Sequence, residues 1–258
     1  SYQNDGNGIY FHPSGSNQLY SGSGGDITII SDKVGLTSST FIQTAGGVLT
    51  FEPLTASTTI GLGDGATGTL NLPQSYFDDY FSGKGYSKIV IGNTSAGNIN
   101  ITDLSLTHDL EIIGTGSWSG SGTITNNGNN LSLNAVASND TWTIGNRITG
   151  AGDLNIDGFG TVILTNNNTG FTGQTNINSG TLQLGNNTTA GSVYQSSEVV
   201  NNSSLVVYRS NDPTMSMAIT GNGTLEKKGS GTLTLSGANT YNGGTTLSGG
   251  YIGLYSSG

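Results

Sequence analysis

A repeat of about 71 residues in the second half of the chain limits the possible folds more than any other feature of the sequence. Residues 148–164 (ITGAGDLNIDGFGTVIL) align without a gap to residues 219–235 (ITGNGTLEKKGSGTLTL). Residues 171–184 match residues 241–254 at an offset of 70, and the one-residue difference falls in the loop between the two blocks. Length variation confined to one loop is typical of solenoids, in which each repeat packs on its neighbours.

Within each copy of the repeat, short alternating apolar segments are separated by glycine and asparagine. Leu154 and Ile156, like Leu182 and Leu184, alternate with polar residues, and this two-residue period predicts strands with one side toward a core. Glycine accounts for 43 of the 258 residues and only 9% of residues are charged. The remaining bulk of Ser, Thr and Asn suits turns and strands better than helices. The sequence therefore predicts an all-β fold.

Two kinds of all-β topology fit this pattern. A sandwich or propeller would pair neighbouring strands as hairpins, whereas a parallel β-helix pairs each strand with its equivalent one coil away. Many turns lack the two-residue Asn-Gly form that hairpins favour, which favours the β-helix.

Residues 1–258 are therefore predicted to form a single continuous β-solenoid with short loop excursions, irregular over 1–147 and built from two copies of the repeat over 148–258. Three coils of roughly 23 residues would make one repeat. About eleven coils with a strand spacing near 4.8 Å would give a rod about 50 Å long.

One segment, residues 72–88 (LPQSYFDDYFSGKGYSK), interrupts the rhythm with a group of aromatic residues. The four-residue spacing of Phe77 and Phe81 predicts one helical turn. Aromatic rings stack on sugars and anchor protein interfaces, so this segment is the candidate partner-contact loop. Alternatively, the rings fold back to cover an edge or close a coil. The candidate contact residues are Tyr76, Phe77, Tyr80, Phe81 and Tyr86.

Charge and ligating residues argue against several function classes. The net charge is −9 with only seven lysines and arginines, so no basic patch exists for nucleic acid. No apolar run is long enough for a membrane helix, and without cysteine there is no disulfide or thiolate metal site. The turns at residues 22–26 and 61–65 resemble calcium-binding Gly-Asp repeats, but such sites need tandem copies. His12 and His108 are far apart, and we predict no metal and no cofactor.

Catalysis is not predicted either. Polysaccharide lyases need clustered acids with a basic residue, and glycosidases need a carboxylate pair. Asp78 and Asp79 are adjacent, but no arginine lies near them in sequence, and the 16 acids are scattered mostly at turns. His108 and Asp109 are either a catalytic fragment or, as we expect, an exposed pair at a strand end.

The C-terminal segment resembles a known family. Residues 229–250 (GSGTLTLSGANTYNGGTTLSGG) closely resemble the autotransporter-associated strand repeat of bacterial autotransporter passengers, and residues 158–184 resemble a degenerate copy. Upstream coils, from TAGGVLTFEPL at residue 44 onward, are similar to those of filamentous-haemagglutinin-like exoproteins. The resemblance implies a secreted, right-handed parallel β-helix that is usually adhesive or acts as a stalk, and it implies no catalytic residue.

These observations together predict a structural or adhesive segment of a bacterial surface or secreted adhesin. Its expected partners are a glycan or protein on a host or neighbouring cell, or other copies of itself. Two alternatives stay open, namely a self-associating subunit of an extracellular filament and a carbohydrate-active β-helix enzyme. The chain starts at Ser1 without initiator methionine or signal peptide, which predicts a mature product or an excised segment. The family resemblance implies export across the outer membrane, and the lack of a long apolar run predicts that this segment does not insert into a membrane.

Overall fold

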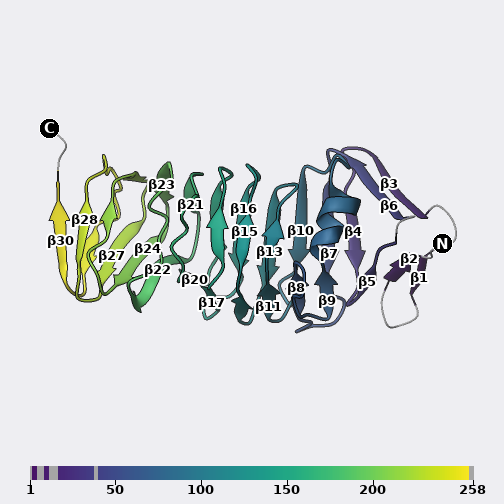
Figure 1. The fold of residues 1–258 in the computed structure, drawn as a ribbon, viewed down its shortest axis with the longest axis horizontal. Coiled ribbons are helices and arrows are strands. Elements are labelled where there is room, and N and C mark those ends of the chain that lie inside the picture. The colour runs from purple at the N-terminus through teal and green to yellow at the C-terminus, as the bar shows by residue number, and fades with distance from the viewer. Residues whose placement is uncertain (1, 5–8, 12–16, 38–39, 256–258) are drawn as a thin grey trace.

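A computed structural model describes residues 2–4, 9–11, 17–37 and 40–255, and it shows short strands stacked along one long axis with the two termini at opposite ends (Figure 1). Leu110 pairs with Leu131, and Leu131 pairs with Leu154, so these two coils contain 21 and 23 residues. Val162 pairs in parallel with Leu182 rather than as a hairpin. The predicted parallel β-solenoid is confirmed, with about 11 stacked coils.

The strands of each coil are distributed over several sheets that surround one core. The nine-stranded sheet consists of β4 (Ile27–Ile30), β7 (Val48–Glu52), β10 (Lys88–Gly92), β13 (Leu110–Gly114), β16 (Leu131–Ala135), β19 (Leu154–Gly158), β21 (Thr175–Ile177), β23 (Glu198–Asn201) and β26 (Ala218–Thr220). The six-stranded sheet consists of β17 (Thr141–Ile144), β20 (Thr161–Leu164), β22 (Thr181–Thr188), β24 (Ser204–Arg209), β27 (Thr224–Lys228) and β29 (Thr245–Leu247).

Smaller sheets complete the coils. The four-stranded sheet consists of β8 (Ile60–Leu62), β9 (Leu70–Leu72), β11 (Ile99–Ile101) and β14 (Trp118–Gly120). One three-stranded sheet consists of β12 (Leu104–Ser105), β15 (Thr123–Thr125) and β18 (Arg147–Thr149), and another of β25 (Thr214–Met215), β28 (Thr232–Leu235) and β30 (Tyr251–Leu254).

The core forms because alternate side chains of each strand point inward. In β16, Leu131, Leu133 and Ala135 are fully buried while the residues between them face outward. One hydrophobic cluster of this kind runs from Ile27 to Leu235. Burying one such aliphatic side chain contributes about 1.5–3 kcal/mol relative to leaving it exposed. The stack of coils is therefore held by a continuous apolar interior together with its ladders of backbone hydrogen bonds.

The sequence repeat does not match a whole number of coils. Strand pairing leads from Leu154 through Thr175 and Val199 to Ile219, in coils of 21, 24 and 20 residues. The sequence equivalent of Leu154 is Leu225, which lies one strand further on, in the six-stranded sheet. The prediction of three coils of roughly 23 residues per repeat is therefore wrong. Each repeat spans three coils plus one face. Such an offset is possible because a strand and its turn bury the same alternate positions whichever face of the solenoid they form.

Glycines occupy corners that no larger residue fits. Gly158 and its repeat equivalent Gly229 have φ angles of +86° and +78°. A Cβ atom would lie 2.3 Å from the carbonyl oxygen of Ala135 at the first position and 2.2 Å from that of Arg209 at the second. Such φ angles disfavour residues that carry a side chain, so the corners keep neighbouring coils at close distance.

The two ends of the rod differ. At the N-terminal end, β1 (Tyr2–Asn4) pairs with β2 (Ile9–Phe11), and this is the one antiparallel pair among the described strands. β2 pairs in turn with β5 (Val34–Gly35), while β3 (Asn17–Ser23) pairs with β6 (Thr40–Ala45). At the C-terminal end, the last strands β29 and β30 leave Leu247 and Leu254 exposed. The hairpin thus changes the strand direction at one end of the stack, whereas the described part of the other end stops with parallel strands.

Candidate functional site

The predicted contact loop folds largely into the core. Residues Tyr76–Phe81 form η1, a π-helix at the place of the predicted helical turn (Figure 1), and it contacts β6. Phe77 and Phe81 are 1% and 0% exposed, and the Phe81 ring centroid lies 5.5 Å from that of Phe51. Tyr86 is also buried. These three candidate contact residues are therefore unavailable to a partner, and the rings cover the core as the alternative interpretation described.

Tyr76 and Tyr80 are the two candidate residues that reach the surface. Both are partly buried, and their rings meet edge to face at 5.5 Å. The Tyr76 hydroxyl accepts a hydrogen bond from the backbone N–H of Leu36 at 3.0 Å. Burial raises the pKa of Tyr80, and the nearby charge of Asp79 raises it further, so the phenol stays neutral. Contact of this loop with a partner stays a prediction that concerns these two rings.

His108 and Asp109 each form hydrogen bonds with a different neighbour. The His108 ring packs 5.3 Å from that of Tyr86, and its Nδ1 lies 3.1 Å from the hydroxyl of Thr107. Burial lowers the pKa of His108, although Asp109 opposes this shift. The Asp109 carboxylate instead accepts two hydrogen bonds from Asn130. The pair is half-buried rather than exposed as expected, and each residue has a structural partner. His12 lies outside the described residues.

The aspartates of the two Gly-Asp turns brace neighbouring segments. Asp26 accepts a hydrogen bond from the backbone N–H of Val48 at 2.8 Å, and Asp64 accepts one from that of Gln74 at 3.2 Å. Asp78 accepts a hydrogen bond from the side chain of Gln74 at 2.8 Å. Within the described ranges, no group of three or more His, Asp and Glu side chains is placed to hold a metal ion.

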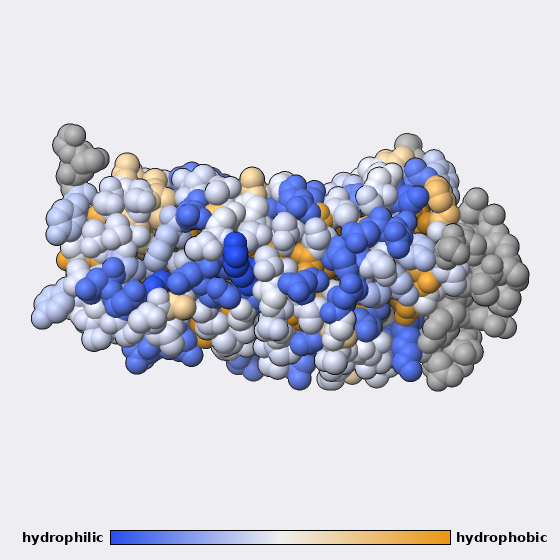
Figure 2. Space-filling view, viewed as in Figure 1, coloured by the Kyte–Doolittle hydropathy of each residue, from blue (hydrophilic) through white to orange (hydrophobic). Residues whose placement is uncertain are grey.

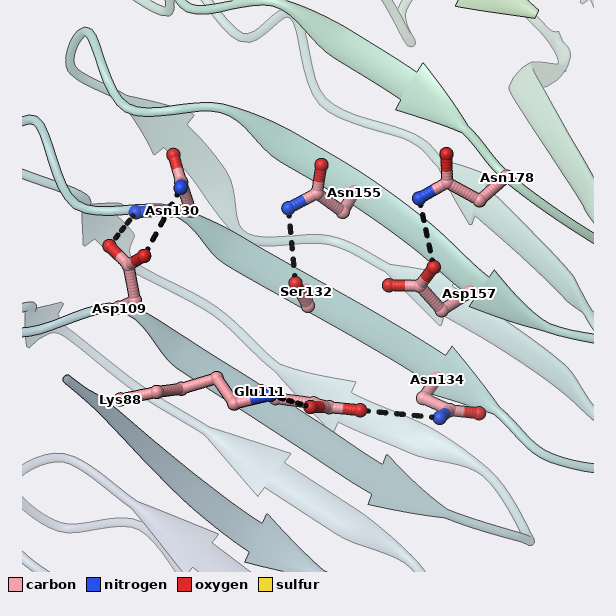
Figure 3. A network of polar contacts seen from close by, with 9 residues as sticks. All are labelled: Lys88, Asp109, Glu111, Asn130, Ser132, Asn134, Asn155, Asp157 and Asn178. Carbon is pink, nitrogen blue, oxygen red and sulfur yellow. Dashed lines mark hydrogen bonds and ion pairs between the residues drawn. The ribbon is translucent and has the colours of Figure 1, made fainter. Parts of the chain in front are cut away.

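Rows of polar side chains link successive coils on the outer side of the nine-stranded sheet (Figure 3). Lys88 forms an ion pair with Glu111 at 2.6 Å, and the other carboxylate oxygen of Glu111 accepts a hydrogen bond from Asn134 at 3.4 Å. Asn155 donates to Ser132 at 3.1 Å in the same manner. The carboxylates and amides of these rows connect one coil to the next and make the stack more rigid. They do not form a pair of converging acids. The face of the molecule drawn in Figure 2 is mostly hydrophilic as well.

Two cationic side chains are buried that the sequence pattern did not predict to be buried. Lys227 is 0% exposed, and its ammonium donates hydrogen bonds to the carbonyl oxygens of Lys228 and Gly229 at 2.5 and 2.9 Å. Burial lowers its pKa, an effect that Asp212 opposes. Arg209 is 4% exposed. The available signal was the repeat itself, because Lys227 occupies the position that the apolar Ile156 holds in the other copy.

Comparison with known proteins gives one family. The passenger-associated-transport-repeat model matches residues 154–184 and residues 225–252. No curated protein and no solved structure matches the chain. Among the described residues, no helix is long and apolar enough to cross a membrane. The two matched stretches are the two copies of the repeat seen in the sequence, and their first strands, β19 and β27, lie in different sheets of the solenoid.

Proposed function

The chain carries two passenger-associated-transport repeats on a β-solenoid, as an autotransporter passenger does, and from this premise we propose that it is a rod of an exported bacterial surface protein. Its role is to hold and display other parts of that protein away from the cell, or to attach the cell to a surface.

One observation carries this proposal, namely the unbroken nine-stranded sheet over one continuous core. Each coil is bound to the next by backbone hydrogen bonds, by apolar packing and by the outer polar rows. Such a stack resists bending, and this mechanical role needs no catalytic group. The exported location is supported by the repeat family, and the mechanical role by the architecture.

Excision of whole coils tests the proposal. Because Leu131 and Leu154 are paired neighbours, removal of residues 131–153 joins two segments that are already in register. We expect cells that display this shortened chain to keep it folded, exported and protease-resistant. A control deletion of residues 131–141 removes fewer residues but breaks the register, so it should abolish folding. Loss of attachment by the folded in-register variant would contradict the rod and indicate a specific adhesive site in the excised coil.

A second candidate, self-association, is favoured by exposed apolar side chains on the last described coil. Tyr251, Leu254 and Tyr255 are 71%, 76% and 67% exposed there, and strand edges with exposed apolar residues are templates for pairing. Light scattering over a range of concentrations tests this. A monomer at all concentrations would contradict self-association, and a dimer or filament that is lost on Leu254→Lys would support it.

A further inference from the structure

Both arginines of the chain bind the same turn. Arg147 donates from Nε to the carbonyl oxygen of Thr169 at 3.1 Å, and Arg209 donates from Nη1 to the side-chain oxygen of Asn167 at 3.4 Å. They approach from opposite directions along the chain, since one lies before the turn and the other after it. The two ion pairs of the described part of the chain involve lysines. Neither arginine is therefore neutralised by a carboxylate in that part, despite 16 acidic residues.

Arg209 is the more unusual of the two because it is 4% exposed. Its guanidinium donates to the side chain of Asn211, to the side chain of Asn167 and to the carbonyl oxygens of Gly191 and Thr189, all of which are neutral. These four bonds leave one of the five guanidinium N–H groups over. Buried charges in proteins are normally paired, so this cation is unusual in having neutral acceptors and no carboxylate partner among the described residues.

Three further donor groups lie at the same place, one of them buried and two at exposed residues. The Tyr194 ring is 5.3 Å from the Arg209 guanidinium, and the Tyr194 hydroxyl is buried without a hydrogen-bond partner. Burial raises the pKa of Tyr194 to about 12, although the neighbouring Arg209 opposes this shift, so the phenol keeps its proton. The amide oxygen of Asn167 is used by Arg209 and that of Gln195 by the N–H of Gly170. These bonds orient the NH₂ groups of Asn167 and Gln195 as the remaining polar ends.

A cavity of about 290 Å³ collects these groups. It lies between the turn at residues 167–169 and the segment at residues 192–195, and no acidic residue lines it. The lining also contains hydroxyl groups from Thr169 and Ser192. The volume is at the lower end of small-ligand sites and suits one sugar ring better than a longer chain. A lining rich in donors, with one guanidinium and no carboxylate, favours a ligand that supplies negatively charged acceptor oxygens.

We propose that this cavity binds the carboxylate of an acidic sugar, such as a hexuronic acid, with Arg209, Tyr194 and the amides of Asn167 and Gln195 as donors. Arg147 adds positive charge at the rim. The hydroxyl and amide groups around the cavity bind the hydroxyls of the sugar ring. The inference does not depend on the rod function, because a mechanical rod can carry such a site on its side.

Titration of the chain with glucuronate tests the proposal, with glucose and acetate as comparison ligands and isothermal calorimetry or NMR shifts as the readout. We expect glucuronate to bind more tightly than either comparison ligand, and added salt to weaken it. Tyr194→Phe removes only a hydroxyl that has no partner, so it should leave stability unchanged while it weakens glucuronate binding about tenfold. Arg147→Gln, at an exposed position, should weaken binding as well. Lys228→Gln, a charge change on β27, should have no effect.

Several outcomes would overturn the proposal. Absence of glucuronate binding at high millimolar concentration would show that the two arginines only brace the coils. Equal binding of glucose would exclude the carboxylate as the recognised group, and equal binding of acetate would exclude the sugar. Full affinity in a folded Tyr194→Phe protein would place any binding elsewhere.

Discussion

The two copies of the repeat share one sequence pattern but have different surroundings. In the first copy, residues 154–184, Ile177 and Leu184 are 0% exposed because coils lie on both sides. In the second copy, residues 225–252 and the strand end beyond, the equivalents Leu247 and Leu254 are 53% and 76% exposed. The apolar alternation of a solenoid strand is therefore not sufficient to bury its side chains. A further coil must also cover them, so an equivalent leucine contributes to stability in the first copy and contributes little in the second.

Truncation of the paired leucines should give the largest difference between the copies. Leu184→Ala leaves a cavity in a closed core, so we expect the free energy of unfolding to fall by about 2–5 kcal/mol. Leu254→Ala removes a side chain that is already in solvent, and the expected change is within about 0.5 kcal/mol. Urea unfolding of both variants measures this. Equal losses would mean that the Leu254 side chain is covered in solution, as self-association through this coil requires.

The corner glycines should instead behave alike in both copies. Gly158→Ala and Gly229→Ala each force a side chain into a left-handed φ and against a carbonyl oxygen, so each should lose at least about 1–2 kcal/mol of unfolding free energy. Gly128 also has a positive φ, of +83°, but a Cβ there would meet nothing within 4 Å. Gly128→Ala is the matched control and should be milder. Identical losses in all three variants would contradict the role of close coil contact.

A smaller effect, seen only in alkaline solution, should distinguish Lys227 from Ile156. Because burial lowers the pKa of Lys227 from its ordinary value of 10.5, the unfolded chain holds this proton more strongly than the folded one. Folding therefore carries a penalty below the folded-state pKa that is relieved as the pH rises toward 10.5. Relative to Lys227→Met, the native protein should gain stability over that range.

Unfolding measured at neutral and alkaline pH for both proteins tests this, since tyrosine ionisation affects them equally. Lys33→Met, at an exposed position, is the control for the loss of one positive charge. Parallel pH profiles for native protein and Lys227→Met would contradict the assignment.

The smallest difference concerns Glu226, which stands where the first copy has Asn155. A hydrogen bond from Ser248 lowers the pKa of Glu226, against the effect of burial, and the Lys228 ammonium at 3.1 Å lowers it further. The carboxylate therefore stabilises the fold above its ordinary pKa, and this contribution is lost as the pH falls through the folded-state value. Glu226→Asn should cost less than about 1 kcal/mol at neutral pH and nothing in strong acid. A cost that persists in acid would show that packing, not charge, is responsible.

The sequence was sufficient for the strand pattern and the type of pairing. Alternation at Leu154 and Ile156 marks residues that are in fact buried, and the pairing of Val162 with Leu182 follows from the solenoid. It was not sufficient for the phase of the repeat. Every face buries alternate residues between glycine corners, so an offset of 71 cannot reveal on which face a copy starts. Turns whose lengths vary from coil to coil account for the difference between the 71-residue offset and a whole number of coils.

The sites were harder to predict than the fold. The aromatic loop was recognised, but a segment with rings on several sides does not reveal which of them turn inward, and Phe77 and Phe81 did so. The meeting of Arg147 and Arg209 at one turn depends on the lengths of the coils between them. A single sequence without coil boundaries does not give those lengths.

The offset of three coils plus one face also determines how surface features recur along a longer rod. Where a coil is divided among three sheets, as by β13, β14 and β15, each further copy of the repeat would present the same outward residues about a third of a turn around the axis. A side chain that recurs in every copy would thus trace a shallow spiral around the shaft rather than a straight stripe. A partner that binds such a residue would meet its successive sites on different sides, and a cell surface or matrix could engage the rod whatever its rotation.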